Sequence, residues 1–223
     1  MSKTAILVDG GFYRKVAHGK WGDYTPTETA DALVRYCHRH LKEHDTMHDL
    51  YRIFYYDCPP TEKKVYHPLL KRTIDFGRDP RFQWTVDFLN RLKEKRKVAL
   101  RLGTLDEQNI FYGLKYSTIK KLLNGDITLD DLTELDFELN LRQKGVDMKI
   151  GIDIASLAYK KQVDQIVLIA GDSDFVPAAK LARREGIDIV LDPLGHSIKE
   201  SLFEHIDGKR SCGNPYPTKQ LNR

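Results

Sequence analysis

Five short runs of mainly apolar residues, with helix-like segments between them, constrain the fold of this chain most. The runs cover residues 4–8, 51–56, 98–102, 165–170 and 188–191. Several of them are continuously apolar rather than alternating, which is typical of strands whose two faces are both covered in a parallel sheet. The pattern predicts an α/β fold in which helices flank a central, mainly parallel sheet.

The segments between these runs have helical spacing. Thr25 and Glu28 have the spacing of a capping box, with Pro26 at the first helical position, so a helix is expected to begin there. Further helices are predicted at 82–95, 147–159, 175–184 and 197–204. Strand and helix therefore alternate along the chain.

One stretch interrupts this alternation. Residues 1–207 are expected to form a single domain with a helical and acidic insertion at about 106–144, followed by a loosely ordered tail at 208–223. The insertion holds a short basic helix around 119–123 and an acidic run at 126–138 that has six carboxylates and no basic residue. This run is interpreted either as a lid or partner surface or as a solvated helical cap.

Composition excludes several classes of protein. The chain has 36 Lys and Arg against 32 Asp and Glu, and a formal net charge of +4 is too small for a polybasic protein. Three cysteines without a CxxC pair argue against a disulfide framework or a cysteine zinc site. No apolar run approaches the roughly 20 residues that span a bilayer, and a signal-peptide core is missing. We expect a soluble, cytoplasmic protein that binds no membrane, with the oligomeric state open and a homodimer among the options.

Aspartates follow the predicted strands, at the edge where ligands bind in an open α/β sheet. Asp9 and Asp57 end the first two strands, Asp172 and Asp174 follow the fourth, and Asp192 ends the fifth. Converging carboxylates repel one another at low dielectric and need a cation, and an all-oxygen set suits Mg²⁺ or Mn²⁺ rather than zinc. The alternative is that these aspartates cap helices or turns. Capping is favoured for Asp192, whereas for Asp57 capping and a functional role are equally compatible with the sequence. For Asp9 and Asp172 a metal role is favoured.

A further carboxylate lies at the start of the helix predicted at 147–159. Asp147 either caps this helix or projects into the same crevice as the strand-end aspartates. Asp153, six residues on, does not share its face, and either orders the site through a hydrogen bond or faces solvent. Lys144, just before Gly145, is placed to neutralise a phosphate beside the metal.

Other arrangements in the sequence give weaker evidence for a functional site. His40, His44 and His48 recur at four-residue spacing, which favours a solvated polar helix face over a metal site. No Ser-His-Asp or Cys-His arrangement, Walker loop or Gly-x-Gly-x-x-Gly motif has the context that it needs. A phosphohydrolase that forms an aspartyl-phosphate on Asp9 is disfavoured, because Gly11 stands where such chemistry usually has a second acid.

Basic residues are concentrated in one part of the chain. Residues 61–101 carry twelve Lys or Arg against five Asp or Glu, with aromatic residues interleaved. The densest stretch, 91–97, includes Lys93, Lys95 and Arg96. Such a segment either follows a phosphodiester backbone, with its rings available for base stacking, or forms a solvated helix face. Beside a carboxylate crevice, the nucleic-acid interpretation gains support.

Four motifs occur in a consistent order within residues 3–207. They are Val8-Asp9-Gly10-Gly11-Phe12-Tyr13, Phe54-Tyr55-Tyr56-Asp57, Gln143-Lys144-Gly145-Val146-Asp147 and Gly171-Asp172-Ser173-Asp174-Phe175-Val176-Pro177. Together they resemble the NYN domain, a relative of the PIN-like nucleases, and are most similar to its LabA-like branch. The resemblance implies a PIN-like, three-layer Rossmannoid fold and metal-dependent cleavage of RNA. Many members have Asn soon after the first Asp, where this chain has Gly10 and Gly11.

The resemblance also implies roles for individual residues. It places the catalytic and metal-binding site at Asp9, Asp147, Asp172 and Asp174, with Asp153 as an acidic residue behind the metal ligands. Substrate binding is predicted for Lys144, Gly10, Gly11, Tyr13, Ser173, Lys93, Lys95 and Arg96. The predicted function is a Mg²⁺- or Mn²⁺-dependent ribonuclease, an endonuclease with RNA as its partner. The alternative is a non-catalytic RNA-binding or regulatory adaptor that retains the acidic site.

Overall fold

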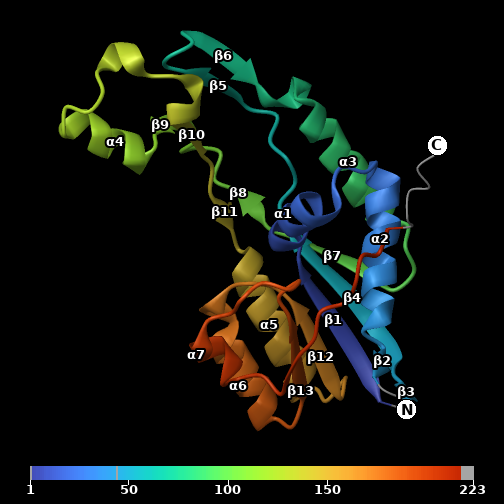
Figure 1. The fold of residues 1–223 in the computed structure, drawn as a ribbon. Helices are drawn as coiled ribbons and strands as arrows, with labels where there is room; N and C mark the ends of the chain where they lie inside the picture. Colours follow the sequence, from blue (N-terminus) through green and yellow to red (C-terminus); the bar gives the residue numbers. More distant parts are fainter. Residues whose placement is uncertain (1, 44, 217–223) are drawn as a thin grey trace, which may run out of the picture.

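A six-stranded parallel sheet forms the centre of the molecule (Figure 1). The computed structural model describes residues 2–43 and 45–216, and within them the strands of this sheet lie in the order β14-β13-β12-β1-β4-β7. Their bounds are β1 Lys3–Asp9, β4 Asp49–Asp57, β7 Val98–Leu102, β12 Gln165–Ile169, β13 Asp188–Asp192 and β14 Gly208–Lys209. Every pair of neighbours is parallel. The predicted α/β class with a mainly parallel sheet is confirmed.

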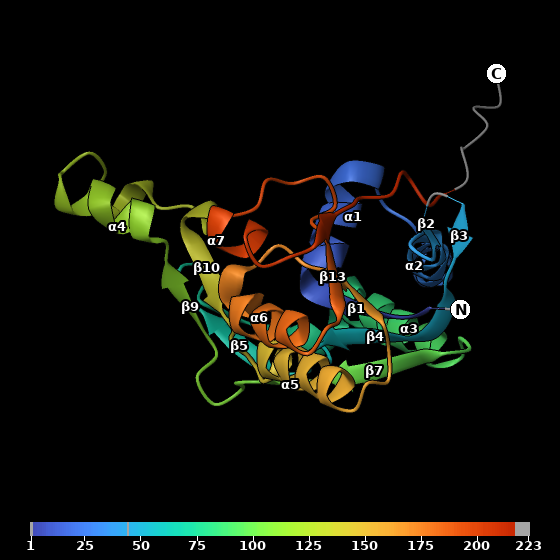
Figure 2. The same cartoon turned by 90° about the horizontal axis from the view of Figure 1, so that it is seen from below.

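Helices cover both faces of the sheet. They are α1 Gly10–Trp21, α2 Pro26–Arg39, α3 Pro80–Lys93, α5 Val146–Tyr159, α6 Val176–Arg184 and α7 Glu200–Phe203. The first three pack on Ile6 and Val8 of β1, whereas the last three pack on Ala5 and Leu7. Alternate residues of a strand point to opposite faces, so one apolar strand supplies both cores. Figure 2 shows α1 and α2 on one side of the sheet and α5 on the other, which gives three layers.

The sequence pattern located the five long strands and most of the helices to within a few residues, but α1 was missed. The capping box of α2 is present: the Thr25 hydroxyl accepts from the Glu28 N–H, and the Glu28 carboxylate accepts from the Thr25 N–H. Two glycines open α1, which weakens its helical signal. That helix begins at Asp9, whose carboxylate accepts a hydrogen bond from the Phe12 N–H.

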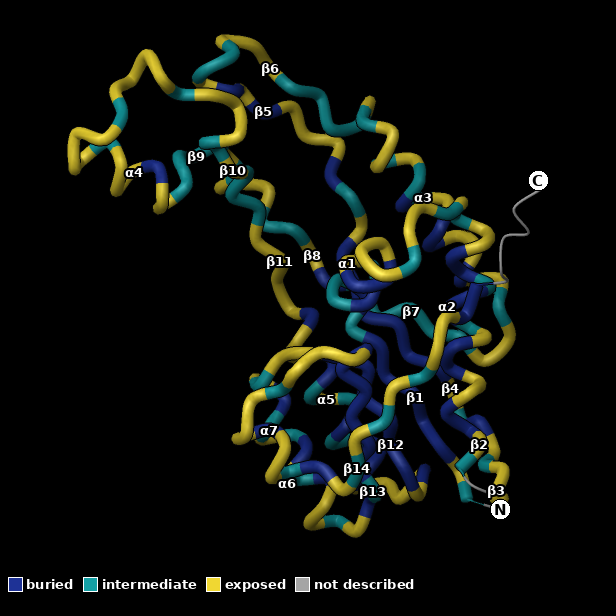
Figure 3. Tube along the Cα trace, in the orientation of Figure 1, coloured by how far each residue is buried: buried dark blue, intermediate teal, exposed yellow. Residues whose placement is uncertain are grey.

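An arm projects from the carboxyl edge of the sheet, and we define it as residues 64–79 and 104–144. It contains β5 Lys64–His67, β6 Arg72–Asp75, η1 Phe76–Arg78, β8 Thr104–Leu105, β9 Phe111–Leu114, α4 Tyr116–Leu123, η2 Leu129–Asp131, η3 Glu134–Asp136, β10 Phe137–Asn140 and β11 Gln143–Lys144. β9 pairs with β10 and β8 with β11, both antiparallel, and β5 contacts β9. Figures 1 and 2 show the arm extending away from the sheet, and Figure 3 shows it mostly exposed or half-buried, in contrast to the dark strands.

The acidic run of the arm has a local structural role. Asp131 accepts hydrogen bonds from the Thr128 N–H and hydroxyl, and Asp136 accepts the same pair from Thr133. These bonds lower the pKa of both carboxyls. Two of the six carboxylates therefore cap the short 3₁₀ turns η2 and η3.

The tail differs from its prediction over the residues that the structure describes. Residues 208–216 were expected to be loosely ordered, but β14 pairs with β13, and Tyr216 is buried and stacks on Tyr24 with ring centroids 3.7 Å apart. The Cys212 N–H donates to the Tyr36 hydroxyl at 3.0 Å. The order comes from buried rings and satisfied polar groups, which composition does not reveal. Residues 217–223 lie outside the described part of the chain.

The predicted histidine face does not form. His40 is fully buried and its Nε2 donates to the Asp192 carboxylate at 2.8 Å, while His48 lies against the Thr4 hydroxyl; His44 lies outside the described residues. Asp192 also accepts from the hydroxyls of Tyr36 and Ser211, both at 2.6 Å. This buried hub ties the end of β13 to α2 and to the tail.

No helix in the described ranges combines the length and apolar character needed to cross a bilayer.

We expect Tyr36→Phe to lower the free energy of unfolding by about 1–3 kcal/mol, because the substitution leaves the Cys212 N–H without its acceptor and removes one of the two donors to Asp192 Oδ2. Urea unfolding at neutral pH measures the effect. Tyr66→Phe is the matched control, since Tyr66 is exposed on β5 and should stay within about 0.5 kcal/mol of the wild type. Equal stabilities for the two variants would contradict the role of the hub.

Candidate active site

Two of the predicted acidic residues end neighbouring strands at the switch point of the sheet. The chain moves outward from β1 through β4 to β7 and then returns to β12 on the other side of β1. In open α/β sheets, ligands bind outside the carboxyl ends of the strands at this point. Asp9 ends β1, and Asp172 lies three residues beyond β12 at the start of the 3₁₀ turn η4, Ser173–Phe175. The register aligns Val8 with Ile169, so both carboxylates belong to the same edge.

Asp9 is the most perturbed of these carboxyls. Burial and the nearby charges of Asp147 and Asp57 raise its pKa to about 6, from a model-peptide value of 3.8. The Phe12 N–H, which donates to Asp9 at 3.1 Å, offsets part of this rise. A carboxyl whose charge is disfavoured near neutral pH marks this position as a candidate functional site.

Asp147 is positioned by the start of α5. Gly145 precedes the helix with φ +81°, a left-handed conformation that glycine adopts without strain, and the buried Val146 anchors the first turn. Asp147 itself is exposed. Partial burial and the charges of Asp172 and Asp174 raise its pKa, so Asp147 lies in the same electrostatic field as the turn after β12.

The turn after β12 presents the aspartate doublet. The Asp172 carboxylate accepts from the Asp174 N–H at 3.1 Å, and both side chains are exposed. The Ser173 hydroxyl accepts from Lys199 Nζ at 3.0 Å. Lys199 is a functional candidate that sequence reasoning missed, because it is 26 residues away from Ser173 and belongs to no motif.

The four carboxylates share one property. In the described residues, none of Asp9, Asp147, Asp172 and Asp174 forms an ion pair with Lys, Arg or His. Uncompensated and mutually repelling carboxylates with only oxygen donors fit Mg²⁺ or Mn²⁺ in charge and in ligand type. No three Asp, Glu, His or Cys side chains of the described chain are grouped closely enough to hold a metal by themselves. Mg²⁺ is commonly held by one or two carboxylates and several waters, so a group of three protein ligands is not required.

Asp153 forms hydrogen bonds toward the sheet instead of facing solvent, and its role in ordering the site stays a prediction. Its carboxylate accepts from Arg101 Nε at 2.9 Å and from the Tyr56 hydroxyl at 2.8 Å. These partners lie on β4 and β7, so Asp153 joins α5 to the sheet and its charge is compensated. The sequence could not show this pairing, because it depends on which face of α5 meets the sheet.

Lys144 lies beside the site, but its ammonium forms an ion pair with a carboxylate of the arm. Its ammonium is 2.8 Å from the Asp106 carboxylate and lowers the pKa of that group. The Lys144 side chain is 59% exposed and has three donors, so it retains donors for a further anion.

Gly10 and Tyr13, predicted to bind substrate, belong to the core instead. A Cβ on Gly10 would lie 2.5 Å from the Tyr55 ring and 2.6 Å from the Tyr56 carbonyl oxygen, so glycine is required for α1 to pack on β4. Tyr13 is fully buried against Trp21 and Tyr36. Gly11 is half-buried beside the Asp9 carboxylate, where its role stays a prediction.

The basic segment of the sequence is divided between two places. Lys93 ends α3, and Lys95 and Arg96 lie between α3 and β7, at the amino edge of the sheet, where Lys95 pairs with Asp31 of α2 at 2.5 Å. They are therefore at the opposite edge from the acidic site, and their contact with substrate stays a prediction. Residues 61–81 lie at the arm, beside the carboxyl edge, and carry six Lys or Arg against three Asp or Glu.

Arg14 is a further residue that the sequence did not single out. It lies on α1, and its Nη2 donates to the Asp57 carboxylate at 2.9 Å. Asp57 is fully buried, and burial raises its pKa against the opposing effect of Arg14. Arg14 thus compensates the charge of Asp57 next to Asp9. Arg14 lies five residues after Asp9, and this spacing indicates that the two residues are close together only once α1 is known to be a helix.

The chain was compared with protein-family models, with curated proteins and with solved structures. The family model of the NYN domain matches residues 86–203, more than half of the chain, including Asp147, Asp172 and Asp174 but not Asp9. No curated protein matches the sequence. Among solved structures, the chain is similar to a protein of unknown function from Vibrio parahaemolyticus, with 13% identity and a TM-score of 0.47 over 96% of this chain and 95% of that one. The match to the family model shows that this chain belongs to the NYN domain family.

Proposed function

We propose that this protein is a Mg²⁺- or Mn²⁺-dependent ribonuclease that cleaves RNA internally at the carboxyl edge of the sheet. The observation that carries the proposal is the set of uncompensated carboxylates, Asp9, Asp147, Asp172 and Asp174, at the switch point between β1 and β12. Membership of a family of PIN-like nucleases supports it. A polyanionic substrate needs positive charge at such a site, and carboxylates supply that only through a cation.

A bound divalent cation would lower the pKa of an attacking water and stabilise the charge that develops on the phosphate. Asp9 and Asp172 are the best-placed residues to hold it, since they end adjacent strands of a rigid sheet. Asp147 and Asp174 add negative charge from the helix α5 and the turn η4. Lys199 and Lys144 flank the carboxylates and can neutralise neighbouring phosphates of the substrate.

Asp172→Asn should abolish Mn²⁺-dependent cleavage of a labelled RNA while leaving the protein folded, because the loss of one anionic ligand weakens cation binding. Gel electrophoresis of the RNA products and thermal melting of the protein measure the two properties. Asp130→Asn, an exposed carboxylate of the arm, is the matched control and should retain full activity.

Undiminished turnover by Asp172→Asn would contradict the metal site. A wild type that binds RNA equally in Mn²⁺ and in EDTA without cutting it would replace the nuclease by the RNA-binding adaptor.

Asp147 and Asp153 should behave differently although they lie on the same helix. Asp147→Ala is expected to reduce cleavage at least a hundredfold and to weaken Mn²⁺ binding in calorimetry. Asp153→Ala should leave Mn²⁺ affinity within about threefold of the wild type and instead lower stability by about 1–3 kcal/mol, because it leaves the partly buried Tyr56 hydroxyl and Arg101 unpaired. The reverse ranking would mean that metal binds near the middle of α5.

The raised pKa of Asp9 predicts a pH-dependent gain for Asp9→Asn in metal-free buffer. A pKa near 6 in the folded state, against 3.8 when unfolded, means that ionisation of Asp9 opposes folding. This penalty is absent below the unfolded value, grows as the pH rises, and is complete above about 6, where it reaches up to about 3 kcal/mol. Asp9→Asn should therefore be more stable than the wild type at pH 8, with the gain vanishing toward pH 4. Urea unfolding in EDTA across this range tests it; a gain that is independent of pH would contradict the shifted pKa.

A further inference from the structure

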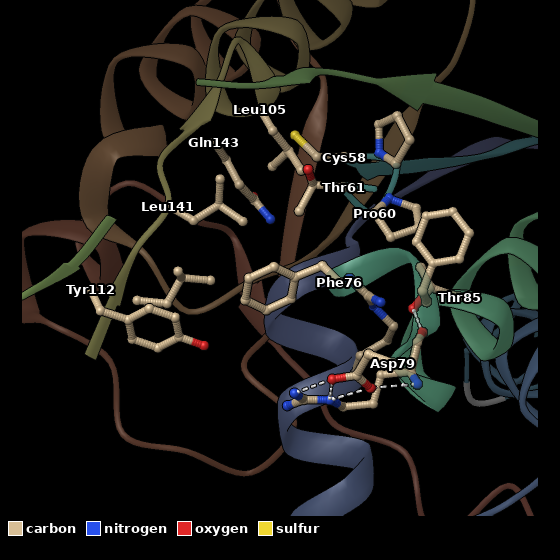
Figure 4. A pocket seen from close by; sticks show the side chains of 15 residues that line it. Cys58, Pro60, Thr61, Phe76, Asp79, Thr85, Leu105, Tyr112, Leu141 and Gln143 are labelled. Atoms are coloured by element: carbon tan, nitrogen blue, oxygen red, sulfur yellow. Dashed lines mark hydrogen bonds and ion pairs between the residues drawn. The ribbon is translucent and has the colours of Figure 1, made fainter. Parts of the chain in front are cut away.

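A cavity of about 490 Å³ lies beside the acidic site, between the arm and α3 (Figure 4). Its walls come from four parts of the chain: α1, the connection after β4, the segment from η1 into α3, and strands of the arm. This volume is within the range of pockets that hold small organic ligands, of roughly 300–1,000 Å³. None of the residues proposed above to hold the metal lines it, so the cavity calls for its own explanation.

Two aromatic rings dominate the cavity. Phe76 of η1 and Tyr112 of β9 point toward one another in Figure 4, with ring centroids 6.4 Å apart and planes within 19° of parallel. Both side chains are half-buried, and the His67 ring lies against Tyr112 with centroids 4.4 Å apart, so each ring keeps only part of its surface exposed. Aromatic faces in a groove are the usual platform on which proteins stack the bases of single-stranded nucleic acid.

The rim of the cavity carries cationic groups. Arg14 and Arg81 both line it, and both also line a second cavity of about 580 Å³ that continues toward α2. Arg14 binds Asp57 through Nη2, while its buried Nε has no hydrogen-bond partner within the described residues. Arg81 uses Nε and Nη2 on Asp79 and is 85% exposed. Arg81 therefore keeps exposed N–H donors for a phosphate, whereas the unpaired Nε of Arg14 is buried.

The cavity lies near the acidic site, because Cys58 directly follows β4, and Tyr56 of β4 is the register partner of Asp9. Cys58 lines the cavity and follows Asp57, whose carboxylate accepts from Arg14. The charge of Asp57 in turn contributes to the raised pKa of Asp9. If one phosphate of a nucleic acid lies at the carboxylates, the neighbouring nucleotide can therefore lie against Arg14. Four basic residues of the segment 61–81, Lys64, Lys71, Arg72 and Arg78, lie on the arm.

We infer that this cavity receives an unpaired base of the RNA, stacked on Phe76 and Tyr112, next to the phosphate bound at the acidic site. This inference rests on the proposed function for the nature of the ligand, since it takes RNA as the polymer. A base stacked on these rings is not stacked within a duplex, so the substrate class is single-stranded RNA. The amide of Gln143, which lines the same cavity, is available to the edge of the base.

Binding measured without cleavage tests this inference. Fluorescence anisotropy in EDTA at fixed ionic strength gives the Kd of a labelled ten-nucleotide oligo(A) and of the same strand in a duplex. Phe76→Ala and Tyr112→Ala are each expected to raise the Kd for the single strand roughly tenfold, the scale of one lost base stack. Tyr66→Ala, an exposed ring of the arm outside the cavity, is the matched control and should stay within about twofold. Duplex binding should be weaker and insensitive to all three substitutions.

Two further variants separate loss of stacking from loss of structure. Phe76→Leu retains an apolar side chain, so it should melt like the wild type and still lose affinity. Tyr112→Phe keeps the ring and should bind like the wild type. A decamer of abasic ribose phosphates should bind the wild type and Phe76→Leu equally, because it has no base to stack.

The outcomes distinguish this inference from the proposed function. An unchanged Kd in folded Phe76→Leu and Tyr112→Ala, or a duplex bound as tightly as the single strand, would overturn the base-binding cavity even if Mn²⁺-dependent cleavage is present. Loss of affinity in the ring variants with no cleavage by the wild type in Mn²⁺ would leave the cavity assigned and overturn the nuclease.

Discussion

The parallel pairing of β1 between β4 and β12 is the constraint on which the rest of this molecule depends. Because the chain builds the sheet outward on one side of β1 and then returns to the other, segments more than 150 residues apart meet at one edge. Asp9 and the Asp172 turn are neighbours only for this reason. The apolar faces of β1 fix its position between two helical layers, so the acidic residues that follow it are held on a rigid base.

Compensation of charge divides the strand-end and helix carboxylates into two groups. Asp57, Asp153 and Asp192 each accept from cationic or hydroxyl groups, and they tie elements of the fold together. Within residues 2–43 and 45–216, Asp9 and Asp147 have no such partner, and the unfavourable field that results raises their pKa values. Residues that destabilise the fold without local compensation are typical of sites kept for a ligand. A divalent cation is the ligand that would relieve this repulsion.

The arm changes how substrate can approach this site. It adds a wall to the carboxyl edge of the sheet, and between that wall and α3 lies a cavity lined by rings and arginines. The acidic site attracts a cation but repels the bare phosphate backbone, whereas the cavity offers cationic donors and stacking surfaces beside it. In the function proposed above, the two features would complement each other: the acidic site would supply the chemistry, and the cavity would supply affinity for single-stranded RNA.

The sequence by itself determined the α/β class, most strand positions and the acidic residues at the strand ends, because apolar period and strand-end chemistry are local properties. It also identified the NYN family from its motifs. Which side chains meet was decided by tertiary structure alone. The core positions of Gly10 and Tyr13, the pairing of Asp153 with Arg101, and the distance between Lys93 and the acidic edge depend on helix rotation and on which end of the sheet a segment reaches. Those quantities are set by packing between distant segments, and no local pattern in the chain encodes them.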